Sequence, residues 1–228
     1  RAMNTLLSIC LILLLSADHG SAAAAGEVWT KDTSVNATKS WKAITSSADG
    51  TKLAAIGSGN IWTSNDTGAT WTKDTSVGAT KQWFGITSSD DGTKLAAAVY
   101  DGNIWTSSNS GATWTTVGAT NKWYDITSSA DGTKLAAVAY NGNIWTSSNS
   151  GATWTENTVD DGTNNWYAIT SSADGTKLAA IVGSGNIWTS SNSGADWTDR
   201  GPTKYWNSIT SSDDGTKLAA TVESSGNI

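Results

Sequence analysis

Residues 41–72 read WKAITSSADGTKLAAIGSGNIWTSNDTGATWT, and units of this design follow one another from Val28 to Ile228. Short segments rich in Thr, Ile, Val and Trp, separated by turn residues, are typical of β-strands. This unit holds four of them, at 41–47, 51–56, 60–64 and 69–72. The unit-ending tryptophans, at 29, 71, 114, 154 and 197, are 42, 43, 40 and 43 residues apart. Four strands in a period of about 40–45 residues predict a β-propeller blade.

Two turns recur in every unit. The first is Asp-Gly, as at 49–50, where glycine supplies a positive φ and aspartate bonds the local backbone. The second has the pattern S-x-D-x-G-x-T-W, complete at 64–71, and later copies put asparagine in place of aspartate. An asparagine carbonyl can still close an Asx turn, so we expect the geometry to survive. The second type of turn uses Ser64, Asp66, Gly68, Trp71, Asn109, Gly111, Trp114, Asn149, Gly151, Trp154, Asn192, Gly194 and Trp197.

These turns resemble the Asp-box (BNR-repeat) β-propeller superfamily, and the units are similar to those of Ycf48-type photosystem II assembly factors. The resemblance covers 28–228. It implies an all-β propeller of four-stranded antiparallel blades. The same fold carries hydrolases, lectins and assembly factors, so the resemblance leaves the function open.

The lengths of the connections divide the predicted propeller into two faces. The step from the first-strand Trp to the following Asp-Gly is always 8 residues, and from the third-strand to the fourth-strand Trp always 9. The connections from strand 2 to 3 and from strand 4 to the next strand 1 vary, and in an up-and-down blade they share one face. Variable loops on one face favour a binding surface. Neutral drift in loops would give the same pattern.

The two ends of the repeat region predict how the ring closes. Residues 28–32 form a lone fourth strand, and residues 206–228 supply strands 1 and 2 and the start of strand 3. If the N-terminal strand completes the last blade, the chain forms five blades with no free edge. The alternative is that these units belong to a ring of six to eight blades.

The first 25 residues differ from the rest. An apolar run at 6–15 is too short to span a bilayer, and small residues follow at 21–25. We therefore expect a signal peptide at 1–25, a propeller at 26–228, and a chain in the periplasm, extracellular space or an organelle lumen. No membrane span would remain after cleavage. The alternative is a buried N-terminal helix.

Cys10, His19 and Met3 are the only residues of their types, and all lie within this leader. A mature chain without Cys or His excludes thiol and histidine catalysis, His/Cys zinc sites and disulfides. We expect no cofactor and no metal. The formal net charge of −6 argues against a nucleic-acid partner, which needs a basic face.

The tryptophans fall into sets by strand. Those of the third and fourth strands are expected to pack between blades. The first-strand set follows the variable connection and has polar or aromatic neighbours such as Phe84, Tyr124 and Tyr167. Aromatic faces beside polar groups suit sugar rings, and structural packing is the alternative. The predicted ligand-binding set is Trp41, Trp83, Trp123, Trp166 and Trp206, extended by Tyr100 and Tyr140.

Catalysis finds little support in the residues. Arg200 is the only arginine after the leader, so the three-arginine carboxylate clamp of the sialidases in this superfamily cannot form. Asp125 is the one acidic residue at its first-strand position and could serve a two-carboxylate glycosidase with Asp101 or Asp160; a solvated aspartate is the alternative. The sequence therefore predicts a secreted, non-catalytic, lectin-like protein that binds glycans or an extracytoplasmic protein. The alternatives are an assembly scaffold and a glycoside hydrolase.

Overall fold

The structure is a computed structural model that describes residues 13–14, 30–31, 35, 39–78, 80–159, 162 and 164–223. These residues form antiparallel β-sheets and no helix, so no helix long and apolar enough to cross a membrane occurs among them. Two complete four-stranded sheets come first. Blade 1 contains β3 (Trp41–Ser46), β4 (Leu53–Gly57), β5 (Asn60–Ser64) and β6 (Thr72–Lys73); blade 2 contains β7 (Trp83–Ser88), β8 (Leu95–Val99), β9 (Gly102–Ser107) and β10 (Thr115–Asn121).

The next two blades share one eight-stranded sheet, because β12 pairs with both β11 and β15. A fifth, two-stranded sheet follows them, and we call it blade 5. Blade 3 contains β11 (Trp123–Ser128), β12 (Leu135–Gly142), β13 (Ile144–Ser147) and β14 (Thr155–Asn157); blade 4 contains β15 (Asn164–Ser171), β16 (Leu178–Val182), β17 (Ile187–Ser190) and β18 (Thr198–Asp199); blade 5 contains β19 (Trp206–Ser211) and β20 (Leu218–Val222).

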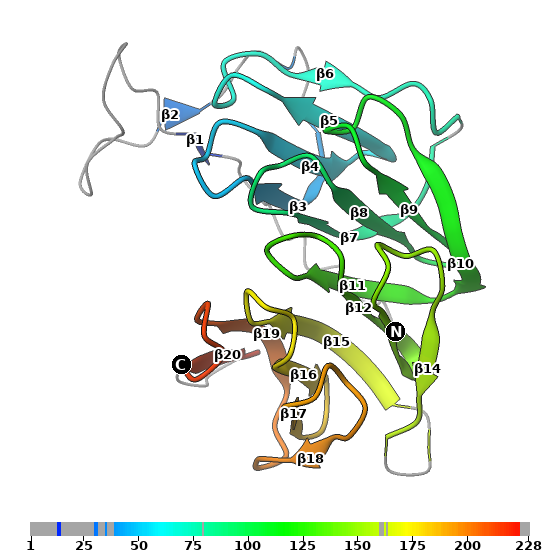
Figure 1. Ribbon diagram of the computed structural model, residues 1–228, viewed down its shortest axis with the longest axis vertical. Helices are drawn as coiled ribbons and strands as arrows, with labels where there is room; N and C mark the ends of the chain where they lie inside the picture. The colour runs from blue at the N-terminus through cyan, green and yellow to red at the C-terminus, as the bar shows by residue number, and fades with distance from the viewer. Residues whose placement is uncertain are drawn as a thin grey trace, which may run out of the picture.

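The blades follow one another along an arc, with the first strand of each blade toward the inside and the fourth toward the outside (Figure 1). Each first strand contacts the next one, in the order β3, β7, β11, β15, β19. The all-β architecture of repeated four-stranded antiparallel sheets is therefore confirmed.

Closure of the ring by the N-terminal strand is not seen. The strand β2 (Thr30–Lys31) pairs with β1 (Leu13–Leu14) in a separate two-stranded sheet, and not with β20. Within the described part of the chain, no contact like those between successive first strands joins β19 to β3. The rest of the predicted leader, and residues 28, 29 and 32, lie outside the described residues.

Blades 2, 3 and 4 each lie between two neighbouring blades and are buried on both faces. The second strands carry small side chains there, and Ala55, Ala97, Ala137 and Ala180 are fully buried. Indole rings fill the remaining space, as where Trp123 meets the rings of Trp145 and Trp154. Burying one such ring removes about 150–250 Å² from water and contributes up to ~4–6 kcal/mol. The predicted packing of third- and fourth-strand tryptophans between blades is confirmed for blades 2, 3 and 4, whose tryptophans lie in three such clusters. In blade 1, Trp62 and Trp71 pack against Trp41 of the same blade.

Both types of turn are closed by side-chain hydrogen bonds. In the complete S-x-D-x-G-x-T-W copy, Asp66 accepts hydrogen bonds from Ser64 Oγ at 2.8 Å and from the Thr70 backbone N–H at 2.9 Å. Asn109 accepts the equivalent bonds from Ser107 Oγ and the Thr113 N–H, each at 2.9 Å. Its amide nitrogen then donates to the Thr113 hydroxyl. The predicted survival of the turn geometry with asparagine is thus confirmed.

The two-faced layout is also confirmed by hydrogen bonds between turns. The strand 3–4 hairpin bonds the strand 1–2 turn of the same blade, as where the Ser150 N–H donates to the Thr133 carbonyl at 2.7 Å. On the other face, the Lys81 N–H of a strand 4–1 connection donates to the Gly59 carbonyl of a strand 2–3 turn at 3.1 Å. The first face is called the hairpin face below, and the second the variable-loop face.

The Asp-Gly turns make folding sensitive to acid. Hydrogen bonds from serine, then from threonine, lower the pKa of Asp49, Asp91, Asp131 and Asp214 from 3.8 to about 2. A depressed pKa in the folded state gives stability that is present above pH 4 and is lost as the pH falls toward 2. We therefore expect the thermal midpoint, measured by circular dichroism, to fall steadily between pH 4 and pH 2.

The variant Asp131→Asn tests one turn of this set. It should unfold at a lower midpoint at pH 6 and show a shallower decline below pH 4, because it lacks one titrating carboxylate. Asp101→Asn, at an exposed position outside these turns, is the matched control. A wild-type midpoint that stays constant from pH 5 to pH 2 would contradict the expectation.

Candidate functional site

Every first strand begins with a β-bulge. In blade 2, Trp83 pairs with Val99 and Gly85 with Ala98, so the residue between them has no partner on β8. The register shifts at the same place in the other four blades. Bulges often re-aim a side chain at a functional surface. The bulged residues are Lys42, Phe84, Tyr124, Tyr167 and Asn207.

The three aromatic bulged residues meet in one cluster with two tyrosines, Tyr100 just after β8 and Tyr140 in the last part of β12. The ring centroids of Phe84 and Tyr124, and of Tyr124 and Tyr167, are 4.9 Å apart. Tyr100 stacks on Phe84 at 5.1 Å, and Tyr140 lies 6.0 Å from Tyr124 and 6.4 Å from Tyr167. All five residues are partly exposed. We call this cluster the aromatic platform: Phe84, Tyr100, Tyr124, Tyr140 and Tyr167.

The local backbone leaves room for the platform. A Cβ atom on Gly183 would lie 2.4 Å from the ring of Tyr167, so that ring lies against a bare glycine. Gly183 occupies the position that Tyr100 and Tyr140 hold in their blades. Each of the three donates its backbone N–H to the backbone carbonyl of the residue before the first-strand Trp. Lysine borders the platform at one end, with the Lys42 ammonium 4.2 Å from the Phe84 ring centroid.

Two phenol groups of the platform, those of Tyr124 and Tyr167, have a pKa raised above the ordinary value for tyrosine. Burial raises the pKa of Tyr124, and the neighbouring tyrosines and the charge of Glu223 raise it further. Burial, Tyr140 and Glu223 raise the pKa of Tyr167 in the same way. No hydrogen bond within the described chain uses a tyrosine hydroxyl of the platform, so these groups remain able to donate to and accept from a ligand.

The predicted tryptophan set lies elsewhere. Trp83, Trp123 and Trp166 are at most 4% exposed, and Trp206 is buried as well; Trp41 is partly exposed. Two of these rings also use their indole N–H inside the molecule, Trp83 to the Gly59 carbonyl and Trp123 to the Ala119 carbonyl, each at 3.2 Å. A buried indole offers no face for stacking on a sugar. This burial argues against the hypothesis for the tryptophans, while Tyr100 and Tyr140 do lie on the accessible platform.

Sequence patterning missed Phe84, Tyr124 and Tyr167 as the central residues. Each is an aromatic residue that directly follows a first-strand Trp, so the repetition was visible in the sequence. The bulge that aims these side chains at the surface was not, because it depends on how the first strand pairs with the second.

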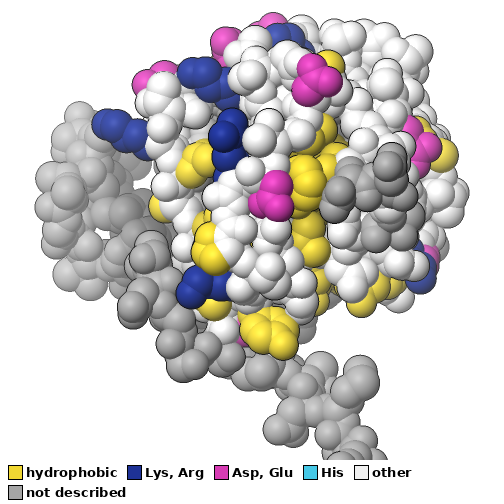
Figure 2. Space-filling view, turned by 90° about the horizontal axis from the view of Figure 1, so that it is seen from below, with side chains coloured by type: hydrophobic (Ala, Val, Ile, Leu, Met, Phe, Trp, Pro, Cys, Tyr) yellow, Lys and Arg dark blue, Asp and Glu magenta, His cyan; other side chains and the backbone are white. Residues whose placement is uncertain are grey.

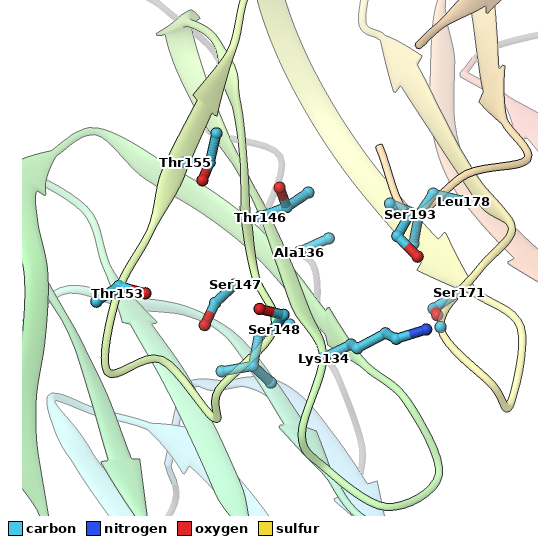
Figure 3. A pocket seen from close by; sticks show the side chains of 12 residues that line it. Lys134, Ala136, Thr146, Ser147, Ser148, Thr153, Thr155, Ser171, Leu178 and Ser193 are labelled. Atoms are coloured by element: carbon cyan, nitrogen blue, oxygen red, sulfur yellow. The ribbon is translucent and has the colours of Figure 1, made fainter. Parts of the chain in front are cut away.

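Similar crevices lie between successive blades on the hairpin face. The crevice between blades 3 and 4 has a volume of about 160 Å³ and is lined by Thr146, Ser147, Ser148, Ser171 and Ser193 around Leu178 (Figure 3). Equivalent residues line crevices of about 170 Å³ between blades 2 and 3 and about 300 Å³ between blades 4 and 5. These repeated concavities lie on the face opposite to the platform.

The carboxylate of Asp125 is held in place by two backbone N–H groups. Its carboxylate accepts hydrogen bonds from the Ile126 N–H at 2.9 Å and from the Ile169 N–H of the next blade at 3.0 Å. Burial of the carboxyl group raises its pKa to about 6, against these two hydrogen bonds. Of its two suggested partners, Asp101 is exposed and Asp160 lies outside the described residues. Asp125 therefore links blades 3 and 4.

No family model matches this sequence, and no curated protein matches it. Solved structures do match. They include an ancestral GH74 enzyme (TM-score 0.67, 13% identity, 86% of this chain and 31% of that chain) and YCF48 bound to D1 peptide (0.61, 14%, 80% and 60%). The GH74 enzyme of Niastella koreensis also matches (0.58, 21%, 73% and 25%). This chain thus spans about a quarter to less than two thirds of these structures. At such identities they establish a propeller-type fold and nothing about activity.

Asp125 should oppose the acid sensitivity of the turns. Its raised pKa means that the folded state binds a proton more tightly than the unfolded state, so its contribution to stability falls as the pH rises from about 4 to 6. At pH 7 the charged carboxylate costs on the order of 3 kcal/mol relative to the unfolded chain. In the variant Asp125→Asn this change of stability with pH is absent, because an asparagine side chain does not titrate.

Urea unfolding followed by tryptophan fluorescence at pH 4 and pH 7 measures this difference. The stability of Asp125→Asn relative to the wild type should rise by on the order of 3 kcal/mol between the two pH values. Asp90→Asn, at an exposed carboxylate, serves as the control. A difference that does not change with pH would show that the carboxylate is solvated.

Proposed function

We propose that this protein is an exported, non-catalytic recognition propeller that binds carbohydrate on the aromatic platform. The observation that carries the proposal is the platform itself, in which bulges aim Phe84, Tyr124 and Tyr167 at one partly exposed surface. Sugar rings present C–H faces that stack on aromatic rings, and their hydroxyl groups need donors and acceptors. Tyrosine supplies both in one side chain.

The proposal does not depend on a closed ring. Blades 2, 3 and 4 contribute all five platform residues, and these blades are joined directly in the structure. A ring of five blades, or of six to eight, stays a prediction, as does membership of the Asp-box superfamily. Neither GH74 enzymes nor YCF48 decides the matter, because the likeness to them is one of fold.

A protein ligand is the second candidate. Its support is the pair of opposite charges at the platform, with the Lys42 ammonium over Phe84 and the charge of Glu223 acting on Tyr124 and Tyr167. Charges at both ends suit an extended peptide. Solved neighbours in complexes support it too, namely YCF48 bound to D1 peptide and the nidogen/laminin complex (TM-score 0.63, 16% identity, 81% of this chain and 72% of that chain).

A glycoside hydrolase is the weakest candidate. Both oxygens of Asp125 accept backbone hydrogen bonds, so it is poorly placed to give a proton to a substrate. Among the described residues, no group of three or more acidic, Cys or His side chains could hold a metal ion.

Tyr124→Ala tests the proposed site, because Tyr124 contacts three of the other four platform rings. The strongest oligosaccharide found on a glycan array is titrated by calorimetry and tryptophan fluorescence. Tyr124→Ala should weaken its binding at least about tenfold, or ~1.4 kcal/mol. Tyr205→Ala is the matched control, since Tyr205 is 65% exposed and outside the platform. It should bind like the wild type.

The stoichiometry separates the platform from the crevices. Binding at the platform gives about one site per chain, whereas binding at the hairpin-face crevices gives three or more equivalent sites and leaves Tyr124→Ala unaffected. If no glycan on the array binds, and a peptide array shows binding that Tyr124→Ala abolishes, the ligand is a protein and not a carbohydrate.

Export is tested separately. The apolar run and small residues at 6–25 support a signal peptide, so N-terminal sequencing of protein recovered from a secreting host should begin between residues 23 and 27. An intact leader on that protein, or a chain retained in the cytoplasm, would reject this part of the proposal without affecting the platform.

A further inference from the structure

The aromatic platform contains a pair of tyrosines that meet across the boundary between two blades. Tyr124 of blade 3 and Tyr167 of blade 4 are bulged residues at the same position of successive first strands. Their ring centroids are 4.9 Å apart, with an angle of 32° between the ring planes. Two directly bonded aromatic rings have their centres only slightly closer than this, because the separation is then two ring radii and one carbon–carbon bond.

The two strands that carry this pair are fixed to each other. The residue after Tyr124 is Asp125, and its carboxylate accepts a hydrogen bond at 3.0 Å from the N–H of Ile169, two residues beyond Tyr167. On the hairpin face, a bond from a lysine Nζ to a turn carbonyl joins the same two blades, as it joins every other successive pair. The two tyrosine rings are therefore held within reach of each other before any covalent bond forms.

The other platform residues offer poorer partners for a phenol. Tyr140 lies 6.0 Å from Tyr124, in the same blade, and 6.4 Å from Tyr167. Tyr100 stacks at 5.1 Å on Phe84, whose ring has no hydroxyl group. Phe84 also stands where a tyrosine would be needed at the boundary of blades 2 and 3, since its centroid is 4.9 Å from that of Tyr124. The boundary of blades 3 and 4 is thus where two phenols lie closest.

Both rings are accessible to an oxidant in the solvent. Tyr124 and Tyr167 are partly exposed. Figure 2 shows side chains of the hydrophobic class, in which tyrosine is counted, reaching the surface on the side of the molecule where the last blades lie. Partly exposed rings also change rotamer rapidly, which brings the ring edges of a close pair together.

We propose that Tyr124 and Tyr167 are a modification site, at which oxidation forms a dityrosine that joins blades 3 and 4 covalently. The oxidant is hydrogen peroxide, used by a haem peroxidase. Each phenol loses one electron and its hydroxyl proton, and the two phenoxyl radicals form a carbon–carbon bond between positions next to their oxygens. Those two carbons then release their hydrogens as protons, and a proton returns to each oxygen. The chain loses two hydrogen atoms in all, and one peroxide molecule becomes two of water.

The cross-link would give the chain a covalent restraint that it otherwise lacks. Cys10 is the only cysteine in the sequence, so no disulfide can link one blade to another. Tyr124 and Tyr167 are 43 residues apart, and closing a loop of that length restricts the unfolded chain as a disulfide does. The inference depends on the positions of two rings and not on the proposed carbohydrate ligand.

Treatment of the dilute full-length protein with peroxide and a haem peroxidase tests the proposal. We expect the monomer to lose the mass of two hydrogen atoms and to gain the fluorescence of dityrosine. Trypsin should then release peptides 123–134 and 135–177 as one cross-linked species, with fragmentation placing the bond on Tyr167 and not on Tyr140. An unchanged mass would overturn the proposal, and so would a bond on Tyr140.

Conservative variants identify the two partners. Tyr124→Phe and Tyr167→Phe each remove one hydroxyl group and should lose the cross-linked monomer. Tyr100→Phe, at a partly exposed platform ring, and Tyr205→Phe, at a ring that is 65% exposed outside the platform, are the matched controls and should cross-link like the wild type. A product that disappears with Tyr205→Phe, or that forms only as a dimer, would show random collision and would reject the proposal.

Phe84 allows the cross-link to be moved. With Tyr100→Phe and Tyr167→Phe in place, Phe84→Tyr puts the pair of phenols at the boundary of blades 2 and 3, where the centroids are also 4.9 Å apart. The cross-link should return, now between peptides 82–94 and 123–134. Its return would support selection of the pair by ring separation. A variant that stays without a cross-link would contradict it.

Discussion

The contact between one blade and the next is the interaction on which this molecule depends. Second strands such as Leu95–Val99 carry mostly alanine, so a single sheet has too little apolar volume to form a core of its own. Its core is completed by the neighbouring blade, whose first-strand tryptophan and isoleucine pack against it. A lysine-to-carbonyl bond and a backbone bond then fix the register of the two sheets. Stability of such an array comes from neighbouring pairs, as in other repeat proteins.

The parts of the structure that repeat were predictable from the sequence. The constant spacings of 8 and 9 residues predicted the tight hairpins, and the Asx chemistry predicted that Asn109 would close its turn as Asp66 does. The position of Tyr100 and Tyr140 on an accessible face followed from the variable connection. These features depend on short stretches of chain and on hydrogen bonds within them.

The parts that depend on register between strands were not predictable. The bulge opposite Val99 is visible only once β7 is paired with β8, and it decides that Phe84 faces outward while Trp83 is buried. Asp125 is an odd residue in the sequence, but its bond to the Ile169 N–H requires the position of the next blade. The pairing of Thr30–Lys31 with Leu13–Leu14, away from β20, likewise reflects long-range geometry.

The boundaries between successive blades are nearly identical, and this has a consequence for how the chain folds. Because every internal boundary uses the same lysine, glycine and alanine positions, blade 2 could dock on blade 4 nearly as well as on blade 3. Recognition between surfaces therefore does little to specify sequential order. The connections between blades specify this order instead, because a connection of about a dozen residues or fewer lets each sheet reach only the next sheet along the chain. Lengthening one connection would remove that restraint. It would favour kinetically trapped arrangements in which the blades are docked in the wrong order, a hazard known for arrays of near-identical units.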